Sequence, residues 1–212
     1  MYRAFEIRLY PNNEQKVQIN RTFGACRYIY NNVLSLKQEL YKNFGFKDKD
    51  LNIVDTLKAF NPWLNKIGSQ AICQSLNDLN KAYTNWFNSL TRKSKQKSKA
   101  PKCKKKTDKQ SYRDCMMKKD IFKLLNIETR KISIPKIGDI SYRCGYDFSK
   151  YNITKVCNIT IKKSKTNNYY CSICCECKEQ EKLPTNNFKI GFDLGLKDFL
   201  IDSDGIVINN PK

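Results

Sequence analysis

The sequence predicts an α+β protein in which a β-barrel is interrupted by an inserted helical domain. Apolar and polar residues alternate in residues 2–10, which indicates a half-buried strand. Apolar residues then recur every three or four positions in two stretches, roughly 13–43 and 69–90, which indicates two long helices. From residue 121 onward the period returns to two. A solitary first strand leaves its backbone edge unpaired, so we expect it to join the later strands and complete a barrel.

The first long helix has a start signal and a stop signal. Asn12 followed by Gln15 is a capping-box pattern, and Gly45 suits the left-handed position that ends many helices. The apolar stripe between them consists of Ile19, Phe23, Cys26, Tyr30, Val33, Leu36 and Leu40. We therefore expect one face of this helix to be buried.

A short helix around 51–60 and a turn at Pro62 and Trp63 precede the second long helix, which we expect Ser69 to cap. The apolar face of that helix comprises Ile72, Leu76, Leu79, Tyr83, Trp86, Phe87 and Leu90. Its aromatic residues could stack on nucleic-acid bases. At helical spacing they are more often part of a core, which is the interpretation that we favour.

Residues 92–109 differ from everything around them. They contain ten basic residues against one acid, Asp108, and show no apolar period, which indicates a loop or linker. The segment is either a solvated linker or a strip that follows phosphate groups and becomes ordered on binding. We favour the second interpretation, because clustered like charges repel one another without a counter-charge. The residues predicted to contact nucleic acid are Arg92, Lys93, Lys99, Lys102, Lys104, Lys105, Lys106, Lys109 and Arg113.

A cysteine cluster lies in the last of four later strands. These strands are expected at 131–134, 139–144, 155–163 and 169–177. The cluster Cys171, Cys174, Cys175 and Cys177 has C-x-x-C spacings, which also occur in zinc sites. Because alternate strand residues point to opposite faces, the first two cysteines cannot bind one ion together. We therefore predict that these thiols fill the core and that the chain holds no zinc.

The charge balance points to a polyanionic partner. Lysine and arginine total 40 against 20 aspartate and glutamate, a formal net charge of +20 over 212 residues. Nucleic acid is the first candidate and an anionic membrane the second. The sequence has no long apolar run and no signal peptide, so we expect no membrane partner. Ten cysteines without a secretory signal favour a reducing intracellular location, cytoplasmic or nucleoid-associated.

The chain contains no histidine. This excludes Ser-His-Asp and Cys-His nucleophile systems, histidine-ligated zinc sites and the zinc deaminases whose signature begins with a histidine. Single-strand transposases that hold their metal with paired histidines are excluded for the same reason. Metal chemistry in this chain must therefore use carboxylates or thiolates.

Residues 189–205 place one carboxylate in an open setting. They predict a strand, a tight turn and a second strand, with Asp193 between Gly191 and Gly195 on one face. Neighbours without side chains leave space for a ligand, which suits a metal-bound carboxylate at the start of a nuclease fold. One carboxylate alone does not hold a catalytic metal pair. The nearby acids that we interpret as turn and strand-end residues are Asp198, Asp202 and Asp204.

Together these stretches resemble the TnpB/OrfB-type family, RNA-guided nucleases encoded by insertion-sequence elements and related to compact type V CRISPR effectors. Ile190–Phe199 (Ile-Gly-Phe-Asp-Leu-Gly-Leu-Lys-Asp-Phe) resembles the family's first RuvC motif, and Tyr2–Pro11 resembles its first strand. The other similar stretches are Thr22–Asn31, Pro62–Leu64, Ser69–Ala71 with Leu79, Lys99–Lys106, Gln110–Arg113 and Asn210–Lys212. Cys103 departs from the pattern, since the family commonly has an aromatic residue there.

The resemblance implies a transposon-associated, transposase-type RNA-guided DNA endonuclease whose partners are a guide RNA and DNA. Asp193 corresponds to the first catalytic carboxylate, one of three that hold Mg²⁺ in the family. The other two, and a late zinc ribbon, would lie beyond residue 212. We therefore expect a truncated enzyme that is inactive alone and binds Mg²⁺ weakly. The alternatives are a non-catalytic RNA-binding module and a remnant of an insertion element.

The resemblance also implies a domain order: a wedge-like barrel, a helical recognition domain inserted into it, and the first strands of an RNase H-like (RuvC) domain. The expected boundaries are 1–10 and 110–185 for the barrel, 11–91 for the helical domain, 92–109 for the basic linker and 188–212 for the incomplete RuvC-like domain.

Overall fold

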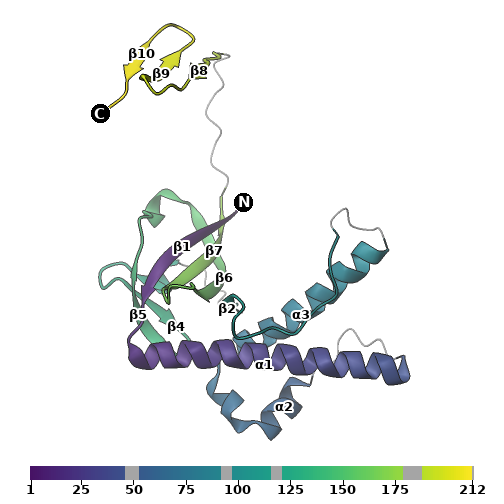
Figure 1. Ribbon diagram of the computed structural model, residues 1–212. Coiled ribbons are helices and arrows are strands. Elements are labelled where there is room, and N and C mark those ends of the chain that lie inside the picture. Colours follow the sequence, from purple (N-terminus) through teal and green to yellow (C-terminus); the bar gives the residue numbers. More distant parts are fainter. Residues whose placement is uncertain (46–52, 92–96, 116–120, 179–187, 212) are drawn as a thin grey trace. The chain divides into compact units, whose positions relative to one another are not determined.

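Strand β1 (Tyr2–Tyr10) lies inside a seven-stranded antiparallel sheet (Figure 1). It pairs with β7 (Tyr169–Cys177) over most of its length and with β5 (Gly138–Arg143) at its end. The other strands are β2 (Gln110–Asp114), β3 (Leu125–Asn126), β4 (Lys131–Ile134) and β6 (Ile153–Lys163), in the sheet order β2-β6-β7-β1-β5-β4-β3. The first strand therefore joins the later strands, as predicted.

This computed structural model describes part of the chain, which divides into two compact units. The described residues are 1–45, 53–91, 97–115, 121–178 and 188–211. The units are Met1–Lys178 and Glu179–Lys212.

The predicted wedge-like barrel is not seen to close among the described strands. Among the described residues, β2 and β3 stand at the two ends of the strand order and do not pair with each other. Closure requires edge strands long enough to hydrogen-bond along each other. Strand β3 has two residues and pairs with β4 alone. The α+β class is confirmed, and no closed barrel is found among the described strands.

Three of the four cysteines of β7 fill the core of the sheet, as predicted. The buried face of this strand consists of Tyr169, Cys171, Ile173, Cys175 and Cys177, and Cys174 between them is half-buried on the other face. Burial raises the pKa of the Cys175 thiol to about 12 and raises that of Cys171 as well. Both therefore remain protonated thiols at neutral pH.

Helix α1 (Asn13–Phe44) begins and ends where its capping signals predict. The amide of Gln15 donates to Asn12 Oδ1 at 2.8 Å, and the Asn12 amide donates to Gln15 Oε1 at 3.0 Å. Gly45 has a φ of 64°, the left-handed conformation expected at this position. The helix is thus fixed at both ends by local hydrogen bonds.

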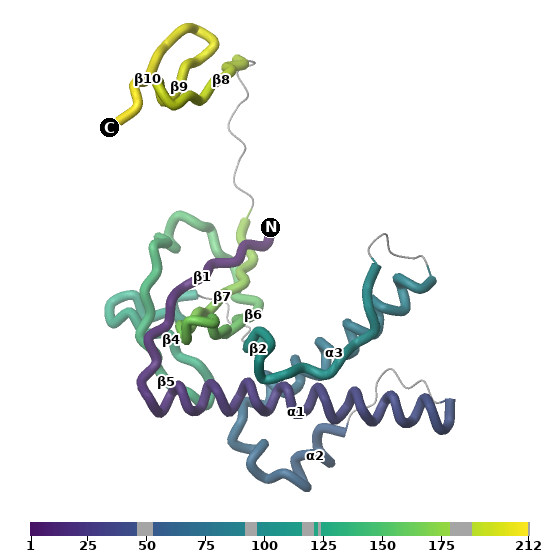
Figure 2. Tube along the Cα trace, viewed as in Figure 1, coloured from purple at the N-terminus to yellow at the C-terminus, as the bar shows by residue number. Residues whose placement is uncertain are grey.

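Helix α1 also belongs to two hydrophobic clusters. Ile19, Phe23 and Cys26 pack with the buried face of the sheet. Further along, Ile29 and Val33 pack with the other helices. Figure 2 traces α1 from the sheet into this helical region. The helix therefore connects the two cores.

The other helices are α2 (Val54–Phe60) and α3 (Ser69–Leu90), with a short 3₁₀ turn, η1 (Pro62–Lys66), between them. The cap prediction for α3 is wrong, because Gly68 is its N-cap and Ser69 is already the first helical residue. In the predicted short helix, residues 51 and 52 lie outside the described residues. No helix among the described residues is long and apolar enough to cross a membrane.

The aromatic cluster of α3 is only partly buried, since Tyr83 packs against the helical core, Trp86 is half-buried and Phe87 is exposed. Phe87 is 44 % exposed, so the core interpretation is wrong for this residue, and Leu90 at the end of the same apolar face is 61 % exposed. The buried residues of α3 end at Leu79 and those of α1 end at Leu34, so neither helix covers the end of the other. Trp86 and Phe87 instead contact each other, with ring centroids 4.9 Å apart.

Asp114 of β2 gives a prediction about stability and pH. It is buried, and desolvation raises the pKa of its carboxyl above the ordinary 3.8. The folded state therefore binds this proton more tightly, and stability falls as pH rises through the interval between the two pKa values. We expect Asp114→Asn to have a higher melting temperature than wild type at pH 7. The difference in melting temperature should shrink as the pH is lowered toward 3.8, the ordinary pKa of an aspartate. Thermal unfolding measures this, with the exposed Asp55→Asn as control; a less stable Asp114→Asn protein at pH 7 would contradict it.

The second unit contains a three-stranded antiparallel sheet in the order β10-β9-β8. Its strands are β8 (Phe192–Asp193), β9 (Asp198–Asp202) and β10 (Val207–Asn209). The predicted strand, turn and strand are present, and β10 adds a strand that was not predicted. Asp193 lies at the end of β8.

Candidate nucleic-acid interface

The described part of the basic segment, residues 97–109, is held against α1 by hydrogen bonds; we name it the lysine loop. It contains no helix or strand, as predicted. The side-chain amide of Asn31 on α1 binds both backbone polar groups of Lys104. Its Nδ2 donates to Lys104 O at 3.0 Å and its Oδ1 accepts from Lys104 N at 2.8 Å. This amide pair fixes the middle of the loop on the helix.

The side chain of Lys104 turns toward the protein. Its ammonium nitrogen lies 4.0 Å from the centroid of the Tyr30 ring, a cation–π contact. Desolvation lowers the pKa of Lys104, and the nearby Asp78 and Cys26 oppose this by raising it. Lys104 thus anchors the lysine loop on α1. The sequence predicted a phosphate contact for Lys104 and not this structural role.

Gln110 fixes the end of the lysine loop. Its Nε2 donates to the carbonyls of Asp108 at 2.7 Å and Lys106 at 3.0 Å, and its Oε1 accepts from Arg27 Nη1 at 2.8 Å. The Asp108 carboxylate accepts from the amide of Lys105 at 2.7 Å, which closes the turn. The only acid of the segment therefore stabilises the loop backbone.

The other predicted contact residues fall into three groups. Arg92 and Lys93 lie outside the described residues. Arg113 forms an ion pair with Asp78 of α3. Five further predicted residues are exposed in the lysine loop and have no ion pair within the described part of the chain: Lys99, Lys102, Lys105, Lys106 and Lys109. The loop therefore presents a row of ammonium groups to solvent.

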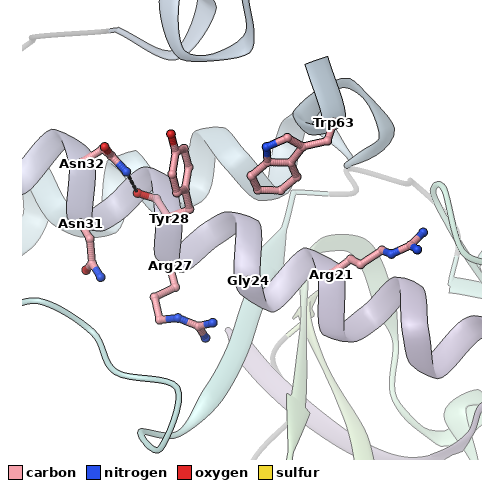
Figure 3. A pocket seen from close by; sticks show the side chains of 7 residues that line it. All are labelled: Arg21, Gly24, Arg27, Tyr28, Asn31, Asn32 and Trp63. Carbon is pink, nitrogen blue, oxygen red and sulfur yellow. Dashed lines mark hydrogen bonds between the residues drawn. The ribbon is translucent and has the colours of Figure 1, made fainter. Parts of the chain in front are cut away.

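A groove on the exposed face of α1 was not predicted from the sequence. Its volume is about 560 Å³ (Figure 3). Its lining residues are Arg21, Gly24, Arg27, Tyr28, Asn31, Asn32 and Trp63. The available signal was a glycine in the middle of a helix, three residues from an arginine on each side.

Asp193 is exposed on β8, and the glycines on either side of it, Gly191 and Gly195, also make contacts within the chain. A Cβ on Gly195 would lie 3.0 Å from the Asp198 carbonyl, so the glycine there permits close approach of the chain to itself. Gly191 exchanges hydrogen bonds with Ser203. Asp202 accepts from the amides of residues 204 and 206, which confirms its interpretation as a turn residue.

The described residues do not form a magnesium site by themselves. No group of three or more His, Cys, Asp and Glu side chains that could hold a metal is found among them. Magnesium is usually bound through carboxylates together with substrate phosphates and water.

One family model matches the beginning of the chain. It is named HTH_OrfB_IS605, is described as a helix-turn-helix domain, and covers residues 1–45. In the structure these residues form β1 and α1, and so contain one helix.

Two relatives match nearly the whole chain. One, from Escherichia coli strain K12 and provisionally named RNA-guided DNA endonuclease InsQ, is 28 % identical over 210 residues, which cover 96 % of this chain and 48 % of the relative. Another, from Streptomyces pristinaespiralis and provisionally named an RNA-guided DNA endonuclease, is 24 % identical over 218 residues, 99 % of this chain and 50 % of the relative. The chain thus spans about half the length of these relatives. The virulence protein VsdF of Salmonella dublin is 31 % identical over 100 residues, 42 % of this chain and 84 % of the relative.

Proposed function

The chain belongs to the TnpB/OrfB-type family, and from this premise we propose that residues 1–212 form the nucleic-acid-binding part of a transposon-associated RNA-guided DNA endonuclease. Its partners are a guide RNA and the DNA that the RNA selects. The observation that carries this proposal is the lysine loop, which α1 holds in place while five of its lysines, Lys99, Lys102, Lys105, Lys106 and Lys109, are exposed. A fixed row of cations binds a phosphate backbone whatever its sequence.

We further propose that residues 188–211 supply the first strands and the first carboxylate of a RuvC-like nuclease domain. The motif around Asp193 and the exposure of this carboxylate on β8 support the assignment. The remaining metal ligands must come from outside the described residues. Mg²⁺, when bound by the full set, activates water and stabilises the leaving oxygen.

The test uses a polypeptide of residues 1–212, a labelled RNA hairpin and a DNA duplex. RNA binding is expected to weaken with salt, with a log–log slope of about −3 to −4 for four or five phosphate contacts. No Mg²⁺-dependent DNA cleavage is expected, because one carboxylate does not hold the metal. Asp193→Ala should bind RNA as wild type does. Fluorescence anisotropy at several KCl concentrations and a gel assay of the DNA measure the two activities.

Two outcomes would contradict the proposal. A salt slope near zero would mean that the lysine loop does not release counterions from phosphates. Mg²⁺-dependent cleavage that persists in Asp193→Ala would mean that the nuclease site lies elsewhere.

A further inference from the structure

The groove on α1 has an open floor at Gly24. A Cβ built on this glycine would meet one atom within 4 Å, Arg27 Nη2 at 4.0 Å, so the fold itself does not require a glycine here. Glycine in the middle of a helix makes the helix less stable than alanine does. Gly24 therefore weakens α1, and no packing contact requires it. Close approach of a ligand to the helix backbone at this position would explain why a glycine is there.

One wall of the groove is aromatic. Trp63 on η1 is 44 % exposed, and its ring meets that of Tyr28 edge to face at 5.6 Å (Figure 3). Turn η1 is fixed beneath it, because Leu64 is fully buried and Gln18 of α1 donates to Lys66 O at 3.0 Å. Trp63 is therefore an exposed ring on a fixed support, which is what a stacking surface requires.

The groove is also cationic. Arg21 and Arg27 lie three residues to either side of Gly24, and no acidic side chain is among the lining residues. Arg27 uses Nη1 to bind Gln110, while its Nη2 lies beside the floor at Gly24. Gln110 is the residue that fixes the lysine loop, so the groove and the loop share one hydrogen-bonded arginine.

We propose that this groove holds one unpaired nucleotide, whose base stacks on Trp63 while its phosphate contacts Arg21 and Arg27 above Gly24. The proposal rests on the proposed function and names a specific subsite within it. A volume of about 560 Å³ lies within the range of small-ligand sites, roughly 300–1,000 Å³. Paired bases are stacked on their neighbours and cannot offer a free face to the indole, so the subsite selects single-stranded RNA or DNA.

The test measures binding of short oligo(U), oligo(dT) and a blunt RNA duplex of equal length. In a Trp86→Phe background, Trp63 is the one remaining tryptophan and reports stacking directly. We expect the single strand to quench its fluorescence and the duplex to quench it far less. Quenching by oligo(U), oligo(dT) or both supports the subsite and shows which strand occupies it. Equal quenching by the duplex would overturn it.

Three substitutions separate the groove from the fold. Trp63→Leu should weaken single-strand binding roughly 5- to 100-fold, as loss of one stacked base does. Arg21→Gln should weaken it about 5-fold at 0.1 M salt, as loss of one phosphate contact does. Gly24→Gln should fill the floor and weaken binding while raising the melting temperature by about 2–4 °C, since glutamine is a better helix former.

The matched controls are Phe60→Leu on α2 and Lys16→Gln on α1, two exposed residues outside the groove. Both should bind as the parent does. If the groove variants also bind as the parent does, the subsite is wrong and the proposed function stands. If the parent protein itself binds none of the probes, the proposed function fails and the subsite fails with it.

Discussion

Replacing Lys102, Lys105, Lys106 and Lys109 together with glutamine should lower RNA affinity by about three orders of magnitude at 0.1 M salt. Each phosphate contact changes log K by roughly 0.7–0.9 per tenfold change in salt, so four contacts amount to about three decades between 0.1 M and 1 M. The log–log salt slope should also become flatter by about 3. Lys104 is left in place because it packs on Tyr30. Anisotropy titrations over a KCl series measure both quantities.

A matched variant separates the position of these charges from their number. Lys131, Lys136, Lys165 and Lys178 are exposed residues at the sheet, and changing them to glutamine removes the same charge. This control should lose only the weak contribution of net charge. Equal losses in both variants would mean that the chain binds RNA through its overall charge and that the lysine loop has no special role.

Local signals in the sequence predicted the elements of the fold well. The Asn12 and Gln15 pattern fixed the start of α1, and alternating burial in β7 follows its side chains residue by residue. These features depend on neighbours three or four positions away, or on a period of two, so the sequence carries them directly. The exposed lysine loop belongs to the same class, because a segment so rich in basic residues cannot be buried as a whole.

Long-range features were harder to predict. Whether a sheet closes depends on the lengths of its edge strands, and the two-residue β3 gave no periodic signal. The exposure of Phe87 depends on where α1 stops covering α3, which no pattern within α3 contains. The groove brings Trp63 of η1 next to Arg21 and Arg27 of α1, which are far away in sequence, so the sequence alone did not predict it. The one sequence signal for the groove was Gly24, a glycine in the middle of a helix.

Tertiary hydrogen bonds bear on two interpretations of the lysine loop that its sequence left open. Composition alone left open whether the segment is a mobile linker or a phosphate-binding strip. Asn31 and Gln110 fix the backbone of its described residues, so those residues present their charges without first becoming ordered. A preorganised loop loses less conformational entropy on binding. Ordering only on binding is therefore wrong for the described residues, and their contact with phosphates stays a prediction.

Ile29→Ala and Ile161→Ala should each destabilise residues 1–178 as a whole, by about 2–5 kcal/mol. Both isoleucines are fully buried, Ile29 in the helical cluster and Ile161 in the sheet cluster. Because α1 packs in both clusters, a cavity in either cluster should weaken the other. Each variant should therefore show one unfolding transition, with its melting temperature lowered by about 5–15 °C.

Two probes measure this coupling. The fluorescence of Trp63 and Trp86 reports the helical region, whereas far-UV circular dichroism reports both regions, so coupled clusters give coincident transitions by the two probes. Val17→Ala, at an exposed position of α1, should change the melting temperature little. A tryptophan transition that shifts in Ile29→Ala but not in Ile161→Ala would instead show that residues 11–91 unfold as an independent domain, and α1 would then not be the element that couples the groove and the lysine loop to the sheet.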